Sequence, residues 1–175
     1  LMEAQNFSMK CMGIAASFPW AALCIVTMAG GYISDKLVAA GVSKHKARTL
    51  FGIGGLILCC IALYLGAVAT VPWKNVLWLT ISLGALGFTF NASWAACIDI
   101  GGKFVGSVSG WMNFWGNIGG IAAPTATAWI ATNYGWQAAI LATAGSAVVG
   151  IIAWIAVKPD IPLVIKKNNN KEKVA

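Results

Sequence analysis

Four stretches of the chain carry no charged side chain, and they constrain its fold more than any other feature. They are residues 11–34, 49–73, 75–98 and 104–157. A helix needs about 20 apolar residues to cross the hydrocarbon core of a bilayer, so each of the first three can cross once. The fourth has room for two crossings, because Asn133, Tyr134 and Gly135 supply a turn near its middle. Only 10% of the residues are charged, against about a quarter in soluble domains, and this excludes a soluble enzyme.

The sequence therefore predicts an all-α integral membrane protein. The five expected transmembrane helices lie at about residues 11–33, 50–71, 76–98, 105–131 and 136–157. Residues 1–157 would form the transmembrane bundle, and residues 158–175 a basic tail that is unstructured and solvated. An odd number of helices after a chain start at Leu1 indicates a fragment, or a protein whose beginning is missing.

The basic residues predict how the helices are oriented in the membrane. The loops after the first, third and fifth helices carry ten of the twelve, namely Lys36, Lys44, Lys46, Arg48, Lys103 and five lysines from Lys158 onward. Only Lys10 and Lys74 lie on the other side. Cytoplasmic loops are rich in Lys and Arg, so the first side and the tail are expected in the cytoplasm of a cell-membrane protein. The net charge of +7 then reflects topology and does not indicate nucleic-acid binding.

The sequence contains no pattern typical of an enzyme or of a metal site. The five cysteines form no CxxC pair and lie in or beside apolar stretches, where cysteine behaves as a small hydrophobic residue. The single histidine, His45, has no second metal ligand at a suitable spacing. We therefore expect no catalytic residues, no cofactor and no metal.

Charge is concentrated in one segment, residues 30–50, whose sequence is GGYISDKLVAAGVSKHKARTL. Gly31 would let a second helix backbone approach, and Asp35 can pair with the start of a neighbouring helix or with an arginine. Lys36 and Arg48 would hold the next helix at the inner membrane face. A solvated basic loop is the alternative interpretation. The segment resembles the G-x-x-x-D-(R/K) loop signature of the major facilitator superfamily, which occurs between helices two and three and between helices eight and nine.

A second segment resembles one branch of the same superfamily. It is residues 91–124, NASWAACIDIGGKFVGSVSGWMNFWGNIGGIAAP, and the matching positions are Asp99, Gly106, Gly110, Asn113, Gly116, Asn117, Gly120 and Pro124. They look like the region joining helices ten and eleven in the anion:cation symporters, which include bacterial hexuronate, galactonate and glucarate transporters and the sialin-like carriers of animals. Gly102 stands where this branch usually has proline, and this departure obscures the subfamily more than the family.

The resemblance implies that the five helices are helices eight to twelve of a twelve-helix carrier. Helices one to seven, the missing amino-terminal bundle, would then lie outside this chain. It also implies a secondary transporter that moves sugar acids or similar organic anions by symport with a cation, either a proton or sodium, and by alternating access. Two alternatives stay open: a carrier for phosphate, a neutral sugar or another solute, and a membrane assembly protein that transports nothing.

Small residues in the same segment predict close helix packing. Gly106 and Gly110, and again Gly116 and Gly120, are spaced four residues apart, which allows two helices in lipid to approach closely. A protein that only assembles with others in the membrane would also use such faces.

Five neutral residues are candidates for substrate binding: Asn91, Ser93, Trp94, Asn113 and Asn117. Amide and hydroxyl groups can bond the hydroxyls of a substrate, and a tryptophan ring can stack on the apolar face of a sugar. Ordinary packing is the alternative for Trp94, and helix-to-helix hydrogen bonding is the alternative for Asn117. The resemblance places Asn113 on the substrate-facing side.

The expected transmembrane helices hold no charge at mid-membrane, because Asp35 and Asp99 sit at their cytoplasmic ends. A proton relay, or a cation that grips a substrate carboxylate, requires such a group within the membrane. If the protein is an organic-anion symporter, both must come from the missing half.

Overall fold

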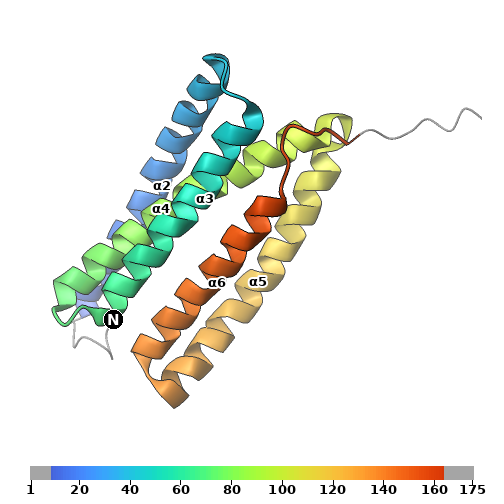
Figure 1. Ribbon diagram of the computed structural model, residues 1–175. Coiled ribbons are helices and arrows are strands. Elements are labelled where there is room, and N and C mark those ends of the chain that lie inside the picture. The colour runs from blue at the N-terminus through green and yellow to red at the C-terminus, as the bar shows by residue number, and fades with distance from the viewer. Residues whose placement is uncertain (1–8, 164–175) are drawn as a thin grey trace, which may run out of the picture.

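The computed structural model describes residues 9–163, and the predictions for residues 1–8 and for the tail from 164 to 175 lie outside this part. The described chain forms helices and no strands (Figure 1). The helices are α2 (Met9–Ala39), α3 (Lys44–Val68), α4 (Pro72–Gly101), the short 3₁₀ helix η1 (Gly102–Phe104), α5 (Val105–Tyr134) and α6 (Trp136–Ala156). All five long helices are rich in apolar residues, so the prediction of an all-α membrane protein is confirmed.

Glycine, serine and proline set the helix boundaries. Gly41 and Gly135 have φ angles of 93° and 88°, which few other residues adopt, and each lies in a tight connection between two helices. The side chain of Ser43 caps α3 by accepting a hydrogen bond from the backbone N–H of Lys46 at 3.3 Å. Pro72 stands at the start of α4, where its missing N–H has no helical partner to lose.

Two helix boundaries differ clearly from those predicted from the stretches without charged residues. Helix α3 begins at Lys44, about six residues before the expected transmembrane stretch, because the Ser43 cap starts it inside the basic segment. Helix α5 continues through Tyr134, so the expected turn of three residues is reduced to Gly135. By length and hydropathy the described chain has four candidate membrane spans, since Pro72–Tyr134 counts as one stretch of 63 residues. The structure divides this stretch at η1 into α4 and α5.

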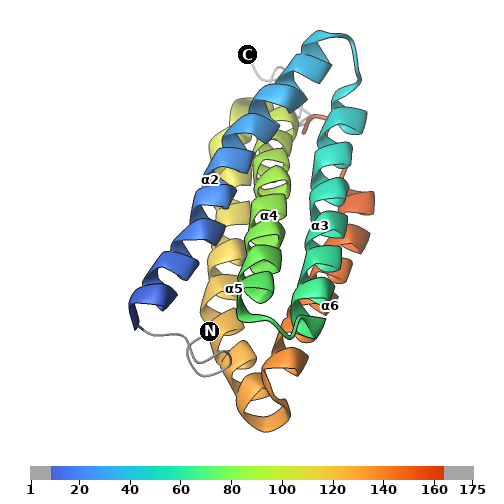
Figure 2. The same cartoon turned by 90° about the vertical axis from the view of Figure 1, so that its left-hand side faces the viewer.

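Helix α4 lies between α2 and α3, as Figure 2 shows. Glycines make these contacts close. A Cβ atom on Gly87 of α4 would lie 2.9 Å from the backbone nitrogen of Thr27 in α2. On the other side, a Cβ atom on Gly55 of α3 would lie 2.7 Å from the carbonyl oxygen of Ala85. In lipid, such small residues allow backbones to come within van der Waals contact.

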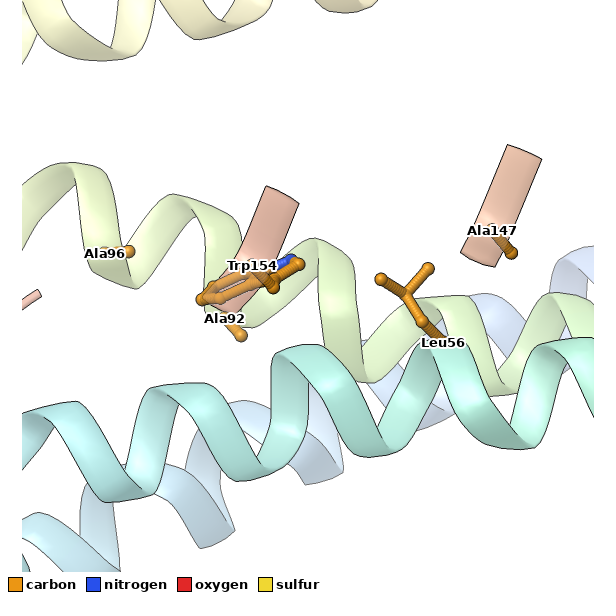
Figure 3. Close-up of a cluster of buried hydrophobic side chains, with 5 residues drawn as sticks. All are labelled: Leu56, Ala92, Ala96, Ala147 and Trp154. Carbon is orange, nitrogen blue, oxygen red and sulfur yellow. The ribbon is translucent and has the colours of Figure 1, made fainter. Parts of the chain in front are cut away.

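Helix α6 packs on α3 around a core of one leucine, three alanines and one tryptophan, to which α4 also contributes. The core consists of Leu56, Ala92, Ala96, Ala147 and Trp154. Figure 3 shows the ring of Trp154 reaching from α6 to the surface of α4 beside Ala92. A Cβ atom on Gly52 of α3 would lie 2.7 Å from this ring, so the absence of a side chain there makes room for the indole.

Helix α5 runs beside α6 at the edge of the bundle (Figure 1). None of its residues is buried, and its large apolar side chains are open to the surroundings, among them Trp111, Phe114, Trp115 and Ile121. A soluble protein rarely exposes so large an apolar surface, and this one is suited to lipid or to other protein segments.

Candidate functional site

A network of charged side chains joins α2, α3 and α4 at one end of the bundle. Ser34 and Asp35 lie near the end of α2, Lys44 and Arg48 in the first two turns of α3, and Asp99 near the end of α4. We call these five residues the charge cluster, and the end of the molecule that carries them the basic end.

Arg48 is at the centre of the charge cluster. Its Nη1 donates to the Oγ of Ser34 at 2.7 Å and to the Oδ1 of Asp35 at 2.8 Å. Its Nε donates to the Oδ2 of Asp99 at 3.1 Å, and the Nζ of Lys44 lies 2.8 Å from the other oxygen of Asp99. One guanidinium group therefore bonds to α2 and α4 from its place in α3.

Burial makes these ion pairs important for the packing of the three helices. The side chains of Arg48 and Asp99 are only 9% and 8% exposed. A charge removed from water is tolerated only with close partners, and two cations here balance two carboxylates. Asp35 differs, because its side chain is 71% exposed and can also meet a group beyond the described residues.

The structure brings together three of the five residues predicted for the cytoplasmic gate, namely Asp35, Arg48 and Asp99. Lys36 does not join them. Its Nζ lies 4.7 Å from the centre of the Tyr32 ring, an exposed cation–π contact on α2. Gly31, the fifth, lies one helical turn before Asp35 and faces α4.

Sequence reasoning missed Ser34 and Lys44 as members of the charge cluster. The sequence predicts that the basic segment is a loop that anchors the next helix, and in a loop the side chains of Lys44 and Arg48 need not point the same way. The feature of the sequence that indicates a helix beginning at Lys44 is Ser43, a favourable N-cap residue. A helix that starts there places Lys44 and Arg48 four residues apart on one face. No comparable signal marked Ser34, which is polar and fully buried.

The predicted substrate residues on α4 point in different directions. Asn91 lies against α2, where a Cβ atom on Gly31 would be 2.5 Å from the Nδ2 of Asn91. Ser93 donates to the carbonyl oxygen of Thr89 at 2.8 Å and lines a cavity on the far side of α4 from this contact. Trp94 is half-buried.

The predicted residues on α5 lie on an open face of that helix. Both asparagines are exposed, and the Nδ2 of Asn117 donates to the backbone oxygen of Asn113 at 2.8 Å and to its Oδ1 at 3.3 Å. The same helix carries the predicted packing glycines, Gly106, Gly110, Gly116 and Gly120. At each of them an added Cβ would meet no described atom within 4 Å. No described helix covers this face, so both roles of α5 stay predictions.

A cavity of about 450 Å³ lies between α3, α4, α5 and α6. Its lining is almost entirely apolar, and the two hydroxyl groups of Thr89 and Ser93 already donate to backbone carbonyls. We call it the apolar cavity. Of the five predicted substrate residues it contains Ser93 alone, so the described helices do not gather these residues around one hollow. The described residues also contain no group of three His, Cys, Asp or Glu side chains that could hold a metal ion.

Comparison with known proteins identifies the family. The family model described as Major Facilitator Superfamily matches residues 1–124, well over half of the chain. The chain belongs to this superfamily. A carrier family accounts for the apolar helices, and its members are transporters, so the prediction that the protein is not an enzyme is confirmed.

Three named transport proteins are similar to this chain over most of its length. The hexuronate transporter of Bacillus subtilis is 31% identical over 89% of this chain and 38% of its own length. The probable galactarate/D-glucarate transporter GudP of Escherichia coli is 28% identical over 92% of this chain and 36% of its own length. The chloroplastic sodium-dependent phosphate transport protein 1 of Arabidopsis thaliana is 26% identical over 87% of this chain and 30% of its own length. The chain thus spans less than two fifths of the length of these relatives.

Proposed function

We propose that the chain is the carboxy-terminal portion of a secondary transporter for sugar acids or similar organic anions. The observation that carries this proposal is the similarity to two bacterial proteins named for galactarate/D-glucarate and hexuronate transport. It extends over 92% and 89% of the chain, respectively. The substrates in both names are sugars that carry carboxylate groups, so the shared chemistry is a polyhydroxylated organic anion.

The rest of such a carrier would supply the amino-terminal helix bundle. The two sugar-acid relatives are more than twice as long as the matched segment. Helices α2 to α6 would then be helices eight to twelve, and transport would proceed as the two bundles rock around a central site. The open face of α5, with Asn113 and Asn117, is the part of this chain best placed to meet that bundle or the substrate.

The basic end is proposed to face the cytoplasm of a cell membrane, as the excess of Lys and Arg on that side favours. There the charge cluster would form part of the inner gate. Its buried members, Arg48 and Asp99, hold α3 to α4, while the exposed carboxylate of Asp35 can pair with the opposite bundle when the inner side is shut. In such a gate the pair of Arg48 and Asp99 would stay in place, while Asp35 would change partners as the gate opens and closes.

Substrate binding by this chain would rely on neutral groups. Asn113, Asn117 and Trp94 offer hydrogen bonds and an aromatic face. The described transmembrane helices carry charged residues only at the basic end and, at their other ends, at Lys10 and Lys74. A cation for the substrate carboxylate, and an acidic group for coupling to a proton or sodium, would come from the amino-terminal bundle.

A phosphate carrier is the second candidate, because one relative is named a sodium-dependent phosphate transport protein. Phosphate has neither the carbon-bound hydroxyl groups nor the apolar face of a sugar acid, so it would rely mainly on cationic groups and make little use of a tryptophan face. The neutral character of this chain's candidate residues therefore favours sugar acids.

Uptake by the full-length protein tests the proposal. Proteoliposomes or cells that express it would be given radiolabelled glucarate, galacturonate, galactonate and inorganic phosphate, with and without an imposed proton or sodium gradient. We expect gradient-dependent uptake of at least one sugar acid and none of phosphate. Uptake of phosphate alone would replace the proposal with the second candidate, and uptake of neither class would contradict it.

A further inference from the structure

We propose that the segment after α6, Val157–Leu163, is a releasable latch that closes the apolar cavity at the basic end. We call this segment the strap. Figure 1 shows it as the red loop that continues beyond the end of α6 and then turns towards the junction of α4 and α5. The sequence predicts that Val157 ends the last helix and that a solvated tail begins at residue 158, whereas the structure places residues 158–163 against the helix ends.

Three contacts fasten the strap. The backbone N–H of Leu163 donates to the carbonyl oxygen of Ile100, near the end of α4, at 2.9 Å. The Oδ1 of Asp160 lies 3.7 Å from the Nδ1 of His45 in the first turn of α3, which makes an ion pair when the imidazole is protonated. Pro159, the residue before Asp160, is fully buried. The strap therefore ties α6 to both α3 and α4.

The position of these contacts links the strap to the apolar cavity. Val157, its first residue, and Ile100, its anchor on α4, both line the cavity wall. The cavity separates α4 from α5 and α6, with Met112 contributing from α5. A strap fastened at Ile100 thus draws the α5–α6 pair towards α4 at the basic end, and its release would let the two parts separate there.

The fastening is weak enough to open without unfolding a helix. His45 and Asp160 are both about half exposed, and an ion pair in such a setting contributes little. The remaining polar attachment is a single backbone hydrogen bond, while the helices keep all of their own. Segments held by few contacts open locally far more often than the whole fold unfolds. The inference goes beyond the proposed function, since it depends on the packing of the helices and not on the substrate.

Cys97 offers a native reporter of release. Its thiol lines the apolar cavity, is buried, and lies 3.3 Å from the Sδ of Met112. The experiment measures the rate at which N-ethylmaleimide labels Cys97 in the full-length protein, by mass spectrometry of the peptide that contains it. Leu163→Pro removes the N–H that bonds Ile100, and Leu163→Ala keeps it, so the two variants form a matched pair.

We expect Leu163→Pro to label about threefold to tenfold faster at Cys97, as the loss of one backbone hydrogen bond would shift an opening equilibrium. Leu163→Ala should label more slowly than Leu163→Pro, and Asp160→Asn should give a smaller increase in the same direction. Cys59 is the internal control, because it is buried where α3, α4 and α6 meet, about four turns into α3 from the basic end, and is not part of the apolar cavity. Equal labelling of Cys97 in wild type and Leu163→Pro would overturn the latch. A parallel rise at Cys59 would also overturn it, because the strap would then stabilise the whole bundle.

Discussion

At the scale of single residues, Arg48 links α3 to both α2 and α4 through its hydrogen bonds. Replacing it with leucine would leave the buried carboxylate of Asp99 with Lys44 as its remaining partner, and Lys44 is half exposed. Removing one member of a buried ion pair costs about 3–5 kcal/mol, since the other charge stays desolvated. We expect Arg48→Leu to lower the free energy of unfolding in detergent by about this amount.

The exposed Lys46, two residues earlier on α3, provides the matched control. Lys46→Leu should change the free energy of unfolding by less than about 0.5 kcal/mol, as most surface substitutions do. Similar values for the two variants would mean that the bonds of Arg48 in the charge cluster contribute nothing to the packing of the helix ends.

Asp35 should affect transport more than stability. Its side chain is largely exposed, and an exposed ion pair is worth less than about 1 kcal/mol, so Asp35→Asn should fold and insert normally. If its carboxylate pairs with the opposite bundle when the inner gate is shut, the uptake rate of the full-length variant should fall. Unchanged uptake at equal protein in the membrane would limit Asp35 to holding Arg48.

The hydrogen bond between the two asparagines of α5 sharpens a prediction about affinity. If Asn113 bonds a substrate hydroxyl, Asn113→Ala should weaken binding by about 0.5–1.5 kcal/mol, up to roughly tenfold in the dissociation constant. Asn117 donates to the Oδ1 of Asn113 and can orient it, so Asn117→Ala should produce a smaller loss. Binding to the full-length protein, measured by calorimetry, checks the order. An Asn117→Ala effect larger than that of Asn113→Ala would reverse the assignment.

At the scale of helices, glycines decide how closely α2, α3 and α4 approach each other. A methyl group on Gly87 would lie 2.9 Å from the backbone nitrogen of Thr27 and 3.0 Å from the carbonyl oxygen of Leu23, neither of which can move alone. Overpacking of this kind costs about 1–3 kcal/mol. We therefore expect Gly87→Ala to destabilise the bundle by that amount, measured as the free energy of unfolding in detergent.

Gly54 of α3 is the control, because a Cβ atom there would meet nothing within 4 Å. Gly54→Ala should be neutral or slightly stabilising, since alanine loses less backbone entropy on folding. If Gly87→Ala and Gly54→Ala change the free energy of unfolding equally, α2 and α4 do not approach each other as closely as in this structure.

The spacing of glycines alone did not predict which helices pack closely in the described chain. The regular four-residue spacing in α5 indicated a packing face, yet its glycines meet no described atom, whereas Gly52, Gly55 and Gly87 make the close contacts. Spacing shows where a helix can be approached, but the neighbour that approaches is determined by the fold. The α5 face remains a predicted contact for a segment outside the described residues.

At the scale of the whole molecule, the charge distribution predicts how the protein crosses the membrane. Lys46 lies at the basic end and Lys74 in the first turn of α4 at the opposite end, and both are exposed. Single cysteines at these positions in the full-length protein should differ in reaction with a membrane-impermeant maleimide added to intact cells. We expect labelling at residue 74 and protection at residue 46. The reverse result would invert the proposed orientation and place the charge cluster outside.

The sequence by itself determined that the chain is helical and embedded in a membrane, because long runs without charge are stable only as helices that satisfy their own backbone bonds in lipid. It also indicated Asp35, Arg48 and Asp99 as important, since charges are rare here and each stands at the end of an apolar run. Only the tertiary structure decided that Arg48 bonds the other two at once, and that Ser34 and Lys44 join them. It alone revealed that Asn91 packs on Gly31 and that Val157–Leu163 folds back on the helix ends. The reason is physical. Whether a stretch of residues prefers lipid or water can be judged from the local sequence, but a contact between residues 13 or 51 positions apart depends on how the helices pack.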